Sequence, residues 1–214
     1  MPVQDTIPGI DRPTAAGNRG KLWEEIVERT CDGYRRQGLG VIRRNPRTWD
    51  YAPAWLWDRC APVARARTGD GRPLIMKKSA PDFTGQLMGV PFEFDAKQFQ
   101  GPSMALKMIA GEELRGHVVE ATADQDKSGA VAGFLCLSTD AMRVFWLPGR
   151  IASAWLYSVR RGEAGTPKSL NFAKPHAWFA PHASDILDLG TCTGVTFDFA
   201  PRLDYQNYKG LQAR

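Results

Sequence analysis

Two carboxylates and a lysine in this chain have the types and the spacing that phosphodiester cleavage requires. Asp82 follows Pro81, and Asp95 comes thirteen positions later, two positions before Lys97. Magnesium prefers oxygen ligands and usually takes one or two carboxylates together with waters and phosphate oxygens. A lysine beside such a metal can orient or polarise the attacking water. The motif therefore predicts the metal-binding core of a nuclease.

The second half of the motif has the periodicity of a β-strand. Residues 92–97 alternate apolar and charged side chains with a period of two, which places Glu93, Asp95 and Lys97 on one face. The even-numbered residues face the other way, into a core. An ordinary half-buried strand with a solvated charged face would show the same alternation, so the decisive feature is the order: Asp82 first, then Asp95 and Lys97 on a strand that can form a hairpin beside it.

The elements expected around the motif alternate between helices and strands. Asn18 can cap a first helix through residues 21–30 that stops near Gly38. The further expected elements are strands at 39–42, 130–138 and 142–147 and helices within 111–127 and at 149–160. This order predicts an α/β fold, and the hairpin pairing of the motif strands favours a mixed sheet over a wholly parallel one.

Length and composition predict one domain with an excursion from it. A chain of 214 residues with 43% hydrophobic content can bury one substantial core. Residues 1–17 are expected to form a flexible arm and residues 18–214 a single domain. Within it, residues 45–78 contain four prolines and a cluster of aromatic side chains that fit no helix or strand pattern. We interpret this segment as an insertion.

Positive charge is concentrated directly before Asp82. The net charge is +5, and residues 35–78 contain eleven lysines and arginines against three acids, so the rest of the chain is net negative. A basic segment with interspersed aromatic residues is typical of a nucleic-acid contact. Solvated arginine pairs are the alternative for Arg35-Arg36 and Arg43-Arg44.

The cysteines and histidines do not predict a zinc site. Cys31, Cys60, Cys136 and Cys192 form no CxxC pair, and the spacing of the histidines matches no zinc finger. Reduced thiols in a bacterial cytoplasm are expected. No segment resembles a signal peptide or a membrane span, so no membrane partner is expected.

Matching segments on both sides of the motif, in the same order, indicate a family. They are Asn18-Arg19-Gly20 with Glu24, Gly38-Leu39-Gly40-Val41-Ile42 with Pro46, Asp82-Phe83-x-Gly85, Glu93-Phe94-Asp95-Ala96-Lys97-Gln98, Lys168-Ser169-Leu170 and Ala200-Pro201-Arg202-Leu203-Asp204-Tyr205. On these segments, across most of its length, the chain resembles the RecU-type Holliday junction resolvases of the PD-(D/E)xK nuclease superfamily.

The resemblance implies a restriction-endonuclease-like core, a mixed central sheet flanked by helices, with a protruding stalk at about 45–78. It implies a homodimer that nicks two strands of like polarity in a four-way DNA junction, one strand per subunit. Asp82, Asp95 and the backbone carbonyl of Ala96 would bind Mg²⁺, with Mn²⁺ as a substitute. Lys97 would be the catalytic lysine and Glu24 an auxiliary acid.

The expected DNA contacts follow from the same resemblance and from the basic insertion. Phosphate contacts are expected from Arg19, Arg43, Arg44, Arg47, Arg59, Arg65, Arg67, Lys77 and Lys78. Trp55 and Trp57 either stack on opened bases or pack against a partner subunit.

The chain departs from the family pattern at several positions. Asp95 stands where Glu is usual, Phe99 replaces a small hydroxyl residue, and His117 is followed by Val118 instead of Gln. A nuclease acting on duplex or flap DNA and a non-catalytic dimeric DNA-binding protein remain alternatives. The compact chain with its divergent stalk also raises the alternative that a phage encodes it.

Overall fold

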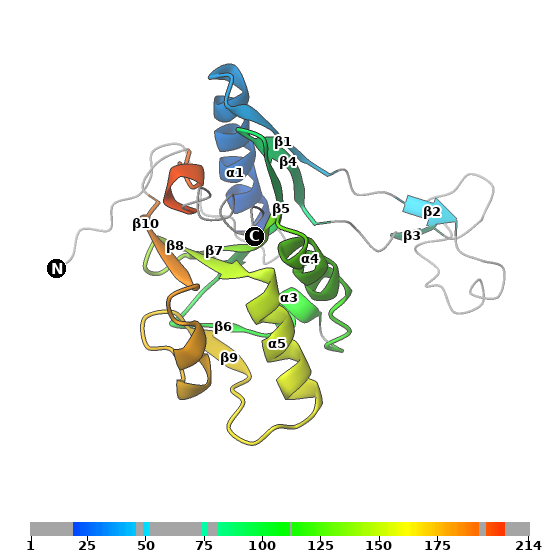
Figure 1. Ribbon diagram of the computed structural model, residues 1–214, viewed down its shortest axis with the longest axis vertical. Helices are drawn as coiled ribbons and strands as arrows, with labels where there is room; N and C mark the ends of the chain where they lie inside the picture. The colour runs from blue at the N-terminus through cyan, green and yellow to red at the C-terminus, as the bar shows by residue number, and fades with distance from the viewer. Residues whose placement is uncertain are drawn as a thin grey trace. The chain divides into compact units, whose positions relative to one another are not determined.

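The chain folds into two compact units. A computed structural model describes residues 19–45, 49–51, 74–76, 81–111, 113–192 and 196–203 (Figure 1). The larger unit is made of Met1–Arg44 and Pro81–Arg214, and the smaller one of Asn45–Ala80. In the smaller unit, β2 (Trp49–Tyr51) pairs antiparallel with β3 (Leu74–Met76).

A mixed sheet forms the centre of the larger unit. Its strands, in spatial order, are β1 (Gly40–Arg44), β4 (Phe83–Leu87), β5 (Val90–Phe99), β7 (Val131–Ser138), β8 (Arg143–Pro148) and β10 (Leu187–Thr191). Only β5 and β7 pair in parallel, and the other neighbours in this sheet are antiparallel. The predicted α/β fold with a mixed sheet is therefore confirmed.

Helices cover both faces of this sheet. α1 (Arg19–Arg36) packs along β1 and β5 on one face, and α4 (His117–Lys127) lies beside α5 (Gly149–Arg160) on the other (Figure 1). Alternate residues of the strands contribute side chains to two separate buried clusters, one on each face of the sheet. Phe94 packs in the cluster that contains Trp23 of α1, and Phe134 in the one that contains Trp155 of α5.

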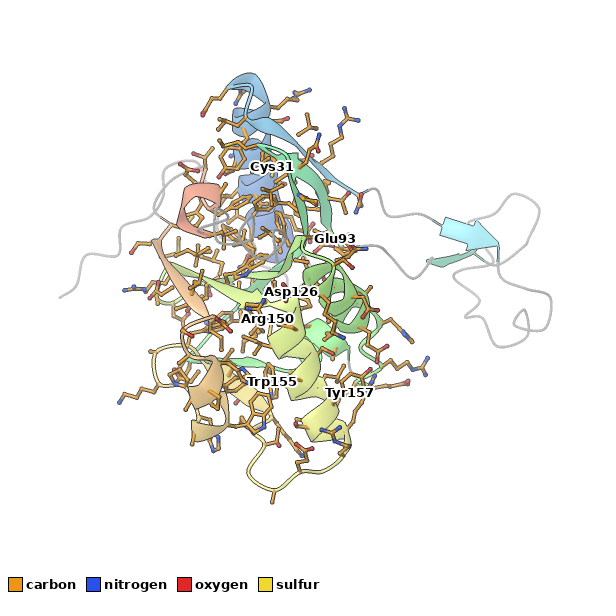
Figure 2. All side chains as sticks on the ribbon, viewed as in Figure 1. Cys31, Glu93, Asp126, Arg150, Trp155 and Tyr157 are labelled. Atoms are coloured by element: carbon orange, nitrogen blue, oxygen red, sulfur yellow. The ribbon has the colours of Figure 1, made fainter. Side chains whose placement is uncertain are left out.

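A buried carboxylate joins the two helices of the second face. Asp126, near the end of α4, accepts hydrogen bonds from the Arg150 backbone N–H at 2.9 Å and from its guanidinium at 3.1 Å. Figure 2 shows the two residues side by side. Since Arg150 is the second residue of α5, Asp126 satisfies a backbone donor that has no partner within that helix. The positive end of the α5 helix dipole also stabilises the negative charge of Asp126.

The predicted elements correspond closely to the observed ones where the pattern was strong. The helix expected at 149–160 is α5, and the strands expected at 130–138 and 142–147 are β7 and β8. The short elements had no clear pattern. They are β6 (Ser103–Ala105), which pairs antiparallel with β9 (Ser169–Asn171), the short helix α3 (Lys107–Ala110), β10, and the 3-10 helices Ala177–His182 and Ala200–Leu203.

The described cysteines are thiols buried in the core. Cys31 lies on α1 (Figure 2), and Cys136 and Cys192 are also free and buried. Burial raises the pKa of Cys31 to about 12 and also raises the pKa of Cys136, so both stay protonated and unreactive. None of the described helices has the length and apolar character that crossing a membrane requires.

Candidate active site

The hairpin of β4 and β5 places the three motif residues next to one another. Phe83 and Phe94 are Cα partners in this antiparallel pair, so Asp82 lies opposite Asp95. The Phe83 and Phe94 rings stack with their centroids 5.2 Å apart, which stabilises the hairpin beneath both carboxylates. Lys97 follows two residues later on the Asp95 face. The hairpin expected from the sequence is confirmed.

Reciprocal hydrogen bonds fix the two carboxylates. The Asp82 backbone N–H donates to Asp95 Oδ1 at 2.8 Å, and the Ala96 N–H donates to Asp82 Oδ2 at 3.3 Å. Each strand thus holds the side chain of the other through its backbone. Such bonds remove rotamer freedom from both carboxylates, which preorganises them.

Lys97 is the positive charge shared by the pair. Its Nζ lies 2.7 Å from Asp95 Oδ2 and 3.8 Å from Asp82 Oδ2. The Asp95 side chain is 5% exposed and the Asp82 side chain 29% exposed, so the Asp82 side opens toward solvent. The Oδ2 atoms of both acids therefore converge on one cation.

The charges in the site change one another's pKa. Burial raises the pKa of Asp82, and the neighbouring Asp95 raises it further, against the opposing effects of Lys97, the Ala96 N–H and Arg44. Burial would lower the pKa of Lys97, but Asp95 and Asp82 outweigh it and raise that pKa overall. The lysine is therefore an ammonium at neutral pH.

Glu24, the expected auxiliary acid, is held by an arginine. It lies on α1, is buried, and forms an ion pair with Arg44 of β1. Arg44 Nη1 also lies 3.7 Å from Glu28 Oε2. The sequence suggested a phosphate contact for Arg44 and did not reveal this pairing, although Glu24 and Glu28 are spaced four apart and so share one helix face. The catalytic role of Glu24 stays a prediction.

Glu93 and His117 have no assigned role in this cluster. Glu93, labelled in Figure 2 near the start of β5, is half-buried, and burial followed by the Asp95 charge raises its pKa. His117 is exposed at the first position of α4. Among the residues that the structure describes, no three His, Cys, Asp or Glu side chains come together as a metal-binding group.

The predicted DNA contacts lie mostly outside the described residues. Arg43 is exposed on β1, and Arg19 opens α1, where the position of its side chain is not described. The predicted contacts that lie outside the described residues are Arg47, Arg59, Arg65, Arg67, Lys77, Lys78, Trp55 and Trp57. These contacts stay predictions.

Fold and site together define the class of protein. A mixed sheet flanked by helices, with two aspartates and a lysine converging on a central hairpin, is compatible with a restriction-endonuclease-like core. The family model of RecU, recombination protein U, matches residues 18–177. The chain belongs to this family, and membership implies a Holliday junction resolvase. No curated protein matches the chain significantly.

Proposed function

We propose that this protein is a magnesium-dependent endonuclease that acts as a homodimer and nicks four-way DNA junctions symmetrically. The observation that carries the proposal is the convergence of Asp82, Asp95 and Lys97 on β4 and β5, in a chain of the RecU family. Basic residues concentrated between positions 35 and 78 supply positive charge for an anionic partner.

The donor set suits magnesium. Asp82 and Asp95 offer hard carboxylate oxygens that converge on a single cation, the Lys97 ammonium. Magnesium needs only one or two protein carboxylates because it retains waters and takes phosphate oxygens from the substrate. A pair of carboxylates without a third acidic or histidine ligand is therefore sufficient.

The residues have distinct proposed roles. Asp82 and Asp95, with the backbone carbonyl of Ala96, would hold the metal ion, which when bound supplies neutralising charge for the scissile phosphate and polarises water. The Lys97 ammonium would donate hydrogen bonds to the attacking water or to a phosphate oxygen and so orient them. The reciprocal backbone bonds keep both carboxylates aimed at the same point.

A cleavage assay with three DNA substrates tests this function. The protein is incubated with a labelled four-way junction, a linear duplex and a flap, with and without magnesium. Magnesium-dependent, symmetric nicking of the junction alone supports the proposal. Cutting of duplex or flap would instead indicate another nuclease specificity, and binding without cutting would indicate a non-catalytic DNA-binding protein.

The variant Asp95→Asn ties the cleavage to the site. It is expected to lose about 10³-fold or more in cleavage rate because the metal loses a charged ligand. Junction affinity, measured by a mobility-shift assay, should persist, since this carboxylate contributes to the chemical step more than to DNA binding. Asp124→Asn, which changes an exposed carboxylate of α4, is the matched control and should cleave normally. Substantial nicking by purified Asp95→Asn would refute the assignment.

A further inference from the structure

Arg44 and Arg43 are sequence neighbours with opposite surroundings. Arg44 ends β1, and its Cα partner on β4 is Phe83, the residue after Asp82. Ile42, two positions earlier, is buried in the cluster beneath α1, so the period of two directs Arg44 to the α1 face as well. Arg43 points away from that face and is exposed. The two arginines therefore meet different partners.

The guanidinium of Arg44 is already paired within the chain. It donates to the Glu24 carboxylate and lies 3.7 Å from Glu28 Oε2. The Glu24 side chain is only 11% exposed, and a buried carboxylate of this kind needs a charged partner. Because an arginine neutralised by two acids is a weak counter-ion for DNA, Arg44 is a poor candidate for a phosphate contact.

Arg44 lies at the end of β1 that adjoins the motif. Its Cα partner Phe83 directly follows Asp82, and Phe83 in turn pairs with Phe94, the residue before Asp95. The ion pair between Arg44 and Glu24 therefore joins α1 to the sheet at positions next to both carboxylates.

We propose that Arg44 is a positioning residue of the cleavage site: its ion pair holds the Glu24 carboxylate in place at the end of β1, next to the hairpin that carries Asp82 and Asp95. This role rests on the proposed nuclease function and differs from the phosphate contact that the sequence suggested. Arg43, exposed on the other face, keeps the DNA-contact role.

Separate measurement of kcat and KM on a four-way junction distinguishes the two arginines. Arg44→Gln is expected to lower kcat about tenfold or more and to change KM by no more than about twofold. Arg44→Lys, which keeps the charge but not the two-sided guanidinium geometry, should recover kcat to within about threefold of wild type. Arg43→Gln should instead raise KM and weaken the salt dependence of binding, with kcat unchanged.

A double variant keeps the test valid if Arg44→Gln unfolds. Arg44→Gln removes the positive charge from the buried Glu24 carboxylate, whereas Arg44→Gln combined with Glu24→Gln removes both charges. Because the proposed effect passes through Glu24, the double variant should match Glu24→Gln alone in kcat. Circular dichroism and thermal unfolding identify which variants are folded.

The possible outcomes separate this inference from the proposed function. Arg44 variants with raised KM and unchanged kcat would overturn the inference, as would a double variant whose kcat loss equals the product of two independent losses. A wild-type protein that nicks junctions while Arg44→Gln retains full kcat overturns the inference alone. A wild-type protein that nicks no DNA overturns both.

Discussion

Two regions of this molecule bury an aspartate beside a basic side chain, and they do so in opposite ways. At the α4–α5 contact, Asp126 accepts hydrogen bonds from the Arg150 backbone N–H and guanidinium, and these bonds favour its charge. At the β4–β5 hairpin, Asp82 has a second carboxylate, Asp95, as a close neighbour, and the two share one lysine.

The causes of the pKa shifts express this difference. Burial is the largest cause in both regions and raises the pKa of Asp126 and of Asp82. The next cause differs in sign: the Arg150 N–H lowers the pKa of Asp126, whereas the charge of Asp95 raises that of Asp82 further. Hydrogen bonds from Arg150 thus oppose the cost of burying the Asp126 charge, whereas Asp82 is held beside a like charge, an arrangement that often marks a functional site.

A large loss of cleavage is expected when the shared cation is removed. Lys97→Met should lower junction cleavage about 10²- to 10³-fold, the loss typical when one preorganised charge is removed from a reacting site. The measurement is single-turnover cleavage under saturating magnesium. Lys127→Met, at an exposed lysine paired with Asp124 on α4, is the matched control and should retain the wild-type rate. Near-normal cleavage by Lys97→Met would mean that the hairpin cluster is structural, like Asp126.

A smaller effect, on stability, is expected at the helix contact. Asp126→Ala leaves the Arg150 N–H without its acceptor and should lower the free energy of unfolding by about 2 kcal/mol. Urea unfolding followed by circular dichroism measures it, and cleavage at low temperature should stay close to wild type. Asp124→Ala, exposed on the same helix, should change stability far less. Equal losses for the two variants would show that burial at Asp126 contributes nothing.

The smallest effect on stability has the opposite sign. Asp82→Asn removes the repulsion between the two carboxylates, so it should raise the free energy of unfolding by about 1 kcal/mol at neutral pH while abolishing cleavage. Thermal unfolding of Asp82→Asn beside Asp124→Asn tests the sign. A lower free energy of unfolding for Asp82→Asn would contradict the proposed difference between the two regions.

The same contrast predicts a pH dependence. A carboxyl whose pKa is higher in the folded than in the unfolded protein binds more protons when folded. The raised pKa of Asp82 therefore costs no stability below the usual value of 3.8, and the cost grows as pH rises through its folded value. Above that range, the stability difference between Asp82→Asn and wild type should be constant. A difference that grows toward acid pH would contradict the assigned direction.

The sequence predicted those parts of the site that are local. The alternation of residues 92–97 identified β5, and the spacing of Asp82 and Asp95 fits a hairpin, because both depend on a few neighbouring residues. Which helices cover each face of β5 depends on residues that are distant along the chain. At Phe99, the face that carries Asp95 packs beneath α4 and α5, so it is not simply a solvated face.

The missed contacts join residues that are distant along the chain. Glu24 and Arg44 are twenty positions apart, and Asp126 and Arg150 are twenty-four apart. Each pairing arises only after helices and strands have packed, and no spacing rule links the partners. The short strands β9 and β10 were missed because elements of a few residues carry too little periodicity to separate them from loops.

The pairing of β1 with β4 also has a consequence for the tolerance of the chain to change. Arg44 and Phe83 are Cα partners, so the chain leaves the sheet before Asn45 and re-enters it after Ala80 at adjacent points. Once the ends of a segment are fixed together, doubling its length adds only about 0.6 kcal/mol of closure entropy. A change in the length of the segment between these two points is therefore expected to cost the larger unit little stability.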